Sequence, residues 1–291
     1  MRFLKCHYER VKMNIEITKL FEKAYNNVCL TKEECMQLLA LEDASPEAVL
    51  MRGVASDIIR RKTGNTGAIF GQIGFECSPC SGNCQFCSFA KDYTMMPTIN
   101  MCDEAIAEAT RNFTGGDDLY CWRLGEGKDT VFSSEQRKQT IMNAKEAGLE
   151  VLDALEPIGV EHTVEEMAEH IMFSMEMGVT QCGAMKRIPV PGTPFENIPA
   201  IGDFTLSKYI AAMVITMAGM ENFPWMGTHE PHIQGYMSGA NMISAETGVN
   251  PRDTAEETST SRGLDVPACK EHLKEAGYEY VARGNGTKMA I

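Results

Sequence analysis

Four cysteines lie within the short segment Cys77–Cys87. Three of them, Cys80, Cys84 and Cys87, are separated by three and then by two residues. Thiolates at this spacing on a glycine-containing loop can wrap one corner of an iron-sulfur cube, because each sulfur can point inward. Three protein ligands leave one iron open to a small molecule. The pattern therefore predicts a [4Fe-4S] cluster, and its open iron can chelate the amino and carboxylate groups of a molecule such as S-adenosylmethionine (SAM).

Two other kinds of site would use all four cysteines. A structural zinc site is one, but its paired CxxC knuckles are normally separated by a much longer spacer than the three residues found here. A closed ferredoxin-type cluster is the other, and its usual bacterial run C-x2-C-x2-C-x3-C-P differs in spacing. Both remain alternatives that fit the spacing less well.

The segment CSGNCQFC resembles the CxxxCxφC signature of the radical SAM superfamily, with Phe86 as the aromatic residue before the last cysteine. From about Leu30 to the C-terminus the chain is similar to the biotin synthase-like branch. The patterns LTKEECMQLLAL, IGVEHTVEE, RIPVPGTPF and YMSGANMISAETG occur in that branch's order. The resemblance implies a [4Fe-4S] cluster and SAM as cofactors, and it assigns no role to Cys77.

By this resemblance, several residues are expected to contact the cofactor. Gly125 and Glu126 stand where many radical SAM proteins carry a Gly-Gly-Glu motif that contacts the methionine end of SAM, although a solvated turn also explains them. Glu156 and Glu161 lie at the carboxyl-terminal end of a predicted strand, the face where barrels place their sites. Glu161 is explained equally well as a favourable charge at a helix N-terminus. Arg187, in the next predicted strand, can hold the SAM carboxylate or a substrate acid by a bidentate contact.

The candidate catalytic residues are His229 and Glu230, which end another predicted strand. A histidine and an acid at this place can transfer protons or bind substrate, although isolated histidines are often structural.

The chain departs from biotin synthase at the expected ligands of a second cluster. Cys121 matches one ligand position, but Leu152 and Asp153 stand where another cysteine is expected, and the segment FPWMGTHEP lacks the arginine. Biotin formation is therefore not expected. The simplest interpretation of the remaining cysteines is that they are small buried hydrophobic residues. These are Cys29, Cys35, Cys102, Cys121, Cys182 and Cys269.

The pattern of apolar residues predicts an α/β fold in two parts, a helical N-terminal extension over 1–66 and a barrel domain over 67–291. Thr31-Lys-Glu-Glu34 is a capping-box pattern, and Ser45-Pro46 supplies a helix cap with a first-turn proline. Strands are expected at 68–75, 118–124, 149–155, 182–190, 223–228 and 240–246, and helices at 103–113, 133–147, 163–177, 205–219, 231–238 and 265–276. This alternation favours a parallel (β/α) radical SAM barrel. Six strands are two fewer than a closed barrel requires, so an open barrel lacking two βα units is expected.

Composition narrows the choice of partners. A net charge of −13 with scattered basic residues argues against nucleic acid. The longest apolar stretch, YIAAMVITMAG, is much shorter than the roughly 20 residues that span a bilayer, and no secretory signal is recognisable, so a cytoplasmic protein is expected.

Together these features predict a radical SAM enzyme. A reductant such as ferredoxin or flavodoxin would deliver an electron, SAM would be cleaved to a 5′-deoxyadenosyl radical, and the radical would abstract hydrogen from a small organic substrate. The alternative is a non-catalytic iron-sulfur protein, either an electron carrier or a degenerate barrel that binds a partner.

Overall fold

Three capped helices form the N-terminal part of the chain: α1 (Ile15–Tyr25), α2 (Lys32–Leu39) and α3 (Pro46–Thr63). The computed structural model describes residues 13–74, 76–95, 97–113, 133–229, 231–248 and 264–291. Thr31 and Glu34 form the expected capping box, and Ser45 caps α3 ahead of Pro46. Gly64 ends α3 with a left-handed φ of 62°, a conformation that glycine adopts without strain. Most of the described chain before the sheet is therefore helical.

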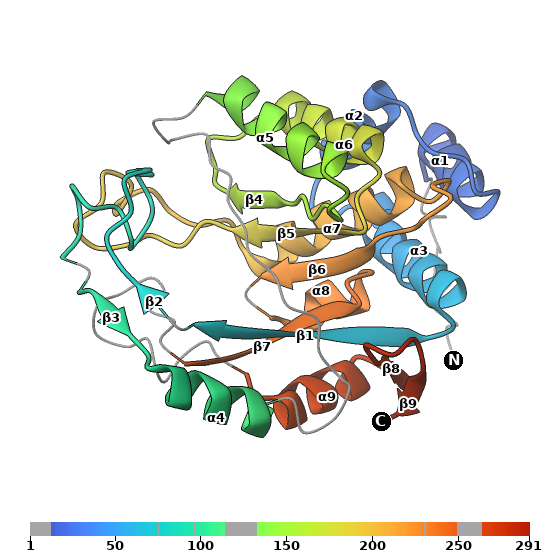
Figure 1. The fold of residues 1–291 in the computed structure, drawn as a ribbon. Coiled ribbons are helices and arrows are strands. Elements are labelled where there is room, and N and C mark those ends of the chain that lie inside the picture. Colours follow the sequence, from blue (N-terminus) through green and yellow to red (C-terminus); the bar gives the residue numbers. More distant parts are fainter. Residues whose placement is uncertain (1–12, 75, 96, 114–132, 230, 249–263) are drawn as a thin grey trace, which may run out of the picture.

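The sheet that follows is open and mostly parallel, as expected (Figure 1). Its strands, in spatial order, are β4 (Leu155–Ile158), β5 (Gln181–Lys186), β6 (Trp225–His229), β7 (Met242–Gly248), β1 (Thr66–Gly74), β8 (Tyr280–Ala282) and β9 (Lys288–Ala290). Every neighbouring pair is parallel except β8 with β9. The last long strand, β7, therefore lies beside the first one, β1, and the described sheet does not close on itself.

The remaining helices follow the strands. They are α4 (Asp103–Phe113), α5 (Ser134–Glu146), α6 (Val164–Met177), α7 (Asp203–Thr216), α8 (Ile233–Met237) and α9 (Val266–Glu275). Figure 1 shows α5 and α6 beside β4, and α4 and α9 beside β1 and β7 at the other end of the curved sheet. Among the described residues, no helix combines the length and apolar character needed to cross a membrane.

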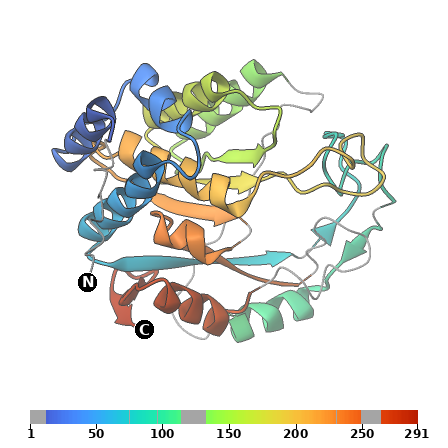
Figure 2. The ribbon, with the colours of Figure 1, turned by 180° about the vertical axis from the view of Figure 1, so that it is seen from behind.

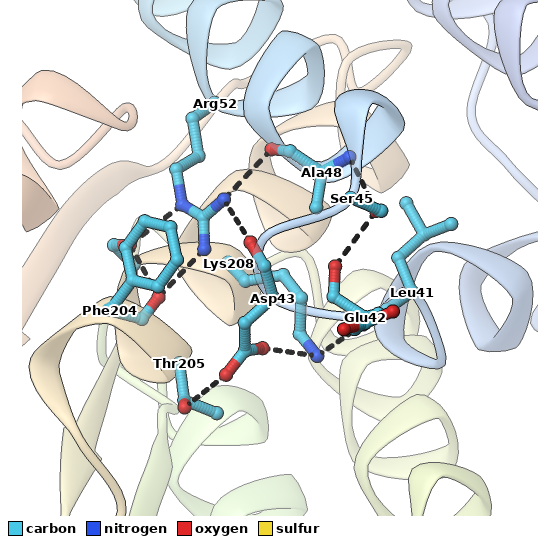
Figure 3. A network of polar contacts seen from close by, with 10 residues as sticks. Leu41, Glu42, Asp43, Ser45, Ala48, Arg52, Phe204, Thr205 and Lys208 are labelled. Carbon is cyan, nitrogen blue, oxygen red and sulfur yellow. Dashed lines mark hydrogen bonds and ion pairs between the residues drawn. The ribbon is translucent and has the colours of Figure 1, made fainter. Parts of the chain in front are cut away.

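A buried polar network joins the N-terminal helices to α7 (Figure 3). The Arg52 guanidinium donates to the Ser207 hydroxyl at 2.9 Å and to the Phe204 carbonyl at 2.8 Å. The Lys208 Nζ atom lies 2.8 Å from the Asp43 carboxylate and donates to the Leu41 carbonyl at 2.7 Å. Because buried cations need such partners, the network fixes α3 and the α2–α3 turn against the barrel.

Two details differ from the predicted elements, and one predicted strand lies outside the described residues. The strand expected at 149–155 is held only by an isolated bridge at Leu152, and the ladder proper begins at Leu155. Its Asp153 side chain bonds to α6. The hairpin β8–β9 and the two-stranded ribbon of β2 (Glu76–Cys77) with β3 (Ile99–Asn100) were not predicted, because strands of two or three residues carry no periodic signal. The strand expected at 118–124 lies outside the described residues.

Candidate functional site

The predicted metal ligands lie on one loop beyond the carboxyl-terminal end of β1. This cysteine loop (residues 78–95) follows β2 and lies beside the loop that joins β5 to α7 (residues 187–202), as both ribbon views show (Figures 1 and 2). Loops at this end of a parallel barrel carry the chemistry in barrel enzymes generally. The position of the cysteine loop therefore agrees with a catalytic role.

Main-chain hydrogen bonds give the cysteine loop a defined shape. The Cys80 amide donates to the Phe89 carbonyl at 2.6 Å, and the Lys91 amide returns a bond to the Cys80 carbonyl at 3.2 Å. Between them, the Cys87 amide donates to the Cys84 carbonyl at 3.1 Å. The three cysteines are thus held within one compact turn.

Asn83 stabilises the tightest part of this turn. Its φ of 47° is left-handed, which asparagine tolerates better than most residues. Its side-chain amide donates to the Asp92 carboxylate at 2.6 Å, and its amide oxygen accepts from the Asp92 backbone N–H at 3.1 Å. The reversal between Cys80 and Cys84 is therefore tied to the far end of the loop.

The three thiols are free and close enough to influence one another. Cys80 is exposed, and Cys84 and Cys87 are partly buried. Burial raises the pKa of the Cys87 thiol, a hydrogen bond from the Phe89 backbone lowers it, and the charges of Cys84 and Cys80 raise it. A positively charged iron site would reverse this repulsion, because metal ligation favours the thiolate.

The chemistry of the three thiols fits an iron-sulfur cluster. Within the described part of the chain, no three His, Cys, Asp or Glu side chains converge closely enough to hold one metal ion. Each thiolate of a cubane binds a different iron, so its ligands need not converge on a single point. Three soft, free thiols on one loop are the ligands that an iron-sulfur cluster requires. The side chain of Cys77 is outside the described set.

The structure describes some of the predicted cofactor and catalytic residues in full, others by their backbone alone or not at all. Phe86 is described and lies partly buried between two of the cysteines. Gly125, Glu126 and Glu230 lie outside the described residues. The backbone of Glu156 belongs to β4, and its side chain is not described.

Glu161 and Arg187, predicted separately, form one ion pair. The Arg187 side chain is 1% exposed, and its Nη2 and Nε atoms lie 2.8 Å and 3.2 Å from the two Glu161 oxygens. Burial raises the pKa of the Glu161 carboxyl, but the hydrogen bond and charge of Arg187 outweigh it and the net pKa falls below its usual value. The bidentate face of this guanidinium is therefore occupied by Glu161.

His229 lies on the face of the sheet opposite the helices. Its neighbour Thr228 faces α8, because the Thr228 hydroxyl is 3.1 Å from the Nε2 atom of His232, the N-cap of that helix. Successive strand residues point to opposite faces, so His229 points away from α8. Its Nδ1 atom is 3.3 Å from the sulfur of Met185, its register partner on β5.

The same face continues across β7 and β1. Gly227 pairs with Met242, and counting along β7 places Glu246 on the face of His229. Gln72 of β1 is the register partner of Glu246. This inner face therefore presents polar residues near the carboxyl-terminal end, where the cysteine loop begins.

The chain is similar to several solved structures. Two of these are structures of the [FeFe]-hydrogenase maturase HydG, one of them from Carboxydothermus hydrogenoformans, and another is of methylornithine synthase (PylB). The HydG structure from C. hydrogenoformans superposes with a TM-score of 0.70 at 13% identity, and the match covers 92% of this chain and 79% of that one. The second HydG structure has a TM-score of 0.72 at 14% identity, and the match covers 93% of this chain and 77% of that one. For PylB the TM-score is 0.59 at 15% identity, covering 91% of this chain and 98% of that chain. HydG and PylB are radical SAM enzymes of the biotin synthase-like branch. The chain has their fold.

No protein-family model and no curated protein sequence matches the chain. The resemblance of the sequence to the radical SAM superfamily is therefore supported by its fold rather than by overall sequence similarity. At identities this low the likeness establishes architecture, and the chemistry must be argued from the site.

Two expectations about the other cysteines need correction. Cys35, Cys182 and Cys269 are buried as expected, but Cys102 is exposed and Cys29 is only partly buried. Cys102 immediately precedes α4, whose described residues are partly or fully exposed, so the part of the chain that the structure describes does not cover its thiol. Cys121 lies outside the described residues.

Sequence reasoning missed two contributors to the site. Gln72 was part of a strand interpreted as purely apolar, and only the register with β7 places it on the inner face. Phe195 contacts the cysteine loop, since its amide donates to the Gln85 carbonyl at 3.1 Å. The proline-rich run VPGTPF around Phe195 was recognised as part of the family resemblance, but nothing in it indicated that contact.

Proposed function

We propose that this protein is a radical SAM enzyme that reductively cleaves SAM and abstracts hydrogen from a small organic substrate. The observation that carries the proposal is the loop that holds the free thiols of Cys80, Cys84 and Cys87 beyond the carboxyl-terminal end of β1, in a radical SAM fold. Three thiolates on one loop leave the fourth iron of a cubane without a protein ligand.

The three cysteines would hold the cluster. When bound, a [4Fe-4S] cluster with an open iron supplies the coordination site and the electron for cleaving SAM to a 5′-deoxyadenosyl radical. Phe86, between the last two ligands, would pack against the bound cofactor. By the family resemblance, Gly125, Glu126 and Glu156 would contact SAM.

The inner face of the sheet would receive the substrate. His229 and Glu230 follow one another at the end of β6, and His229 shares its face with Met185, Gln72 and Glu246. Met185 and Met242 add apolar side chains to this face, and apolar walls would help to keep water away from a radical intermediate. The polar residues at its end can orient a small molecule by hydrogen bonds.

The electron must come from outside the chain. The partly exposed cysteine loop lies at the rim of the barrel, so a reductant such as ferredoxin or flavodoxin can approach it. A small-molecule substrate and such a reductant are the partners that the proposal requires.

The proposal is tested by anaerobic reconstitution of the full chain with iron and sulfide, followed by dithionite and SAM. Formation of 5′-deoxyadenosine, measured by mass spectrometry, supports the enzyme. A chain that binds a stable cluster and yields no 5′-deoxyadenosine is instead a non-catalytic iron-sulfur protein.

Matched cysteine variants sharpen this test. Cys84→Ala should lose both the reduced-cluster EPR signal and 5′-deoxyadenosine. Cys102→Ala removes a thiol that is also free and exposed but lies outside the triad, and it should retain both. Equal losses in the two variants would refute the assignment of the triad.

A further inference from the structure

We infer that Arg187 and Phe195 are positioning residues that hold the cysteine loop in place through the main chain of Gln85. The inference rests on the proposed function only for what the cysteine loop binds. The contacts themselves are made by this chain's own residues.

The first contact fixes Arg187 at the barrel. Its amide donates to the Ile158 carbonyl at 2.8 Å, and its guanidinium is held by both oxygens of Glu161. Gly159 leaves the space for this pair, because a Cβ atom there would lie 2.2 Å from one Glu161 oxygen. The guanidinium is therefore fixed by β4, β5 and the turn after β4, and it is nearly inaccessible to solvent.

The second contact joins Arg187 to the β5–α7 loop. Its Cζ atom lies 5.0 Å from the centre of the Phe195 ring, within the range of a cation–π interaction. Its Nη1 atom makes a long contact of 3.5 Å with the Ile198 carbonyl. The Arg187 guanidinium is held by Glu161 and lies over the Phe195 ring, so the barrel restrains the position of Phe195.

The third contact joins the β5–α7 loop to the cysteine loop. The Phe195 amide donates to the Gln85 carbonyl at 3.1 Å, and Gln85 lies between Cys84 and Cys87. Gly192 packs so closely against the cysteine loop that a Cβ atom on it would lie 2.9 Å from the Tyr93 carbonyl oxygen. The two loops therefore touch at separate points, and one of them is the backbone between two predicted ligands.

The β5–α7 loop is stiff enough to transmit this restraint. The Thr193 hydroxyl donates to the Val190 carbonyl at 2.7 Å, and the Gly192 amide donates to the Glu196 carboxylate at 2.8 Å. The Ile198 amide closes a further turn on the Phe195 carbonyl at 3.0 Å. Contacts run without a gap from Glu161 through Arg187 and Phe195 to Gln85, so a change at Arg187 should alter the cysteine loop without any contact to a cysteine.

Hydrogen–deuterium exchange on the full chain without iron tests the restraint directly. Phe195→Ala should speed exchange in the peptides that contain the protected amides of Cys80, Cys87 and Lys91 by about tenfold, the factor that a cation–π contact of this order supplies. Phe195→Leu keeps the apolar bulk and loses the ring, so it should fold and still speed exchange. Asn197→Ala, an exposed change on the same loop, should leave exchange at the wild-type rate.

Iron release from the reconstituted chain to a chelator gives the second readout. Arg187→Ala and Phe195→Ala should each release iron faster than wild type, and the double variant should be no faster than the faster single variant, because both act through one chain of contacts. Arg187→Lys keeps the charge but loses the planar fork, so it should behave like Arg187→Ala.

Two results would count against the inference or the proposed function. If Arg187→Ala weakens SAM binding while exchange and iron release match wild type, Arg187 binds SAM directly and the inference is overturned. If the wild-type chain assembles no cluster, the proposed function fails, and the exchange experiment on the iron-free chain still decides the inference.

Discussion

Gly159 and Arg187 meet so closely that a Cβ atom on Gly159 would lie 2.5 Å from the Nη2 atom of the arginine. Cβ contacts this short are essentially never seen, and the buried Arg187 guanidinium is held by both Glu161 oxygens, so it cannot yield cheaply. The absence of a side chain at position 159 is therefore a condition for the Arg187–Glu161 pair.

Gly159→Ala is expected to destabilise the fold by about 1–3 kcal/mol, the usual cost of overpacking a filled site. Urea unfolding measures this change. Gly53 is the matched control, because it lies in α3 with no atom within 4 Å of an added Cβ. Gly53→Ala should raise stability by roughly 0.5–1 kcal/mol, since alanine restricts the unfolded chain and favours helix. Equal effects at the two glycines would contradict the steric argument.

The ion pair between Asp43 and Lys208 should respond asymmetrically to the loss of either partner (Figure 3). The Lys208 side chain is 7% exposed, whereas that of Asp43 is 33% exposed and also accepts from the Thr205 hydroxyl at 2.5 Å. Asp43→Ala leaves a buried ammonium with the Leu41 carbonyl and the Tyr209 ring as partners but no counter-charge, and it should cost about 3 kcal/mol. Lys208→Met leaves a partly solvated carboxylate and should cost less. Thermal unfolding of both variants decides the order, and a larger loss for Lys208→Met would refute it.

What the sequence predicted correctly was encoded locally. The Thr31–Glu34 capping box and the Ser45-Pro46 helix start depend on neighbours a few residues apart, and both form. The cysteine spacing is local as well, and the three candidate ligands lie on one loop. The strand predicted at 182–190 ends too late, because β5 ends at Lys186. Pro189 and Pro191 have no backbone N–H to donate to a neighbouring strand, and the prediction gave them too little weight.

The contacts that shape the site are long-range, and no local pattern indicates them. Phe195 meets Gln85, and Arg187 meets Glu161, only after the barrel has brought β1, β4 and β5 together. Arg187 and Glu161 were each singled out from the sequence, yet their pairing depends on the turn at Gly159. Residue types in the sequence therefore indicated which residues lie near the site, whereas their contacts with one another depend on how the strands pair in the fold.

Asp153 illustrates how a departure from the family pattern is accommodated. Its side chain is 2% exposed and bonds to α6, with Ser174 Oγ at 2.6 Å and His170 Nε2 at 3.0 Å. Ser174→Ala should remove one partner of this buried carboxylate and cost about 1–3 kcal/mol. Glu176→Ala, an exposed change on the same helix, should stay within about 0.5 kcal/mol of wild type. Chemical denaturation compares the two, and a neutral Ser174→Ala would show that Asp153 does not depend on this hydroxyl.

His232 should make the stability of the fold sensitive to mild acid. Its Nδ1 atom accepts from the Gly235 amide at 3.2 Å as the N-cap of α8, so the neutral ring carries its proton on Nε2, next to the Thr228 hydroxyl. Burial lowers the pKa of the imidazole, the nearby Asp203 carboxylate raises it, and the positive charges of Lys186 and His272 lower it, with a net decrease from the usual 6.5. A second proton would have to displace the Gly235 bond.

Because the folded pKa of His232 is below the unfolded one, its contribution to stability is present above pH 6.5 and is lost as the pH falls below that value. Wild type should therefore lose more unfolding free energy than His232→Asn on going from about pH 8 to about pH 5, since asparagine keeps the N-cap but does not titrate. Urea unfolding at a series of pH values measures the difference. Parallel pH profiles for the two chains would show that His232 titrates alike in the folded and unfolded states.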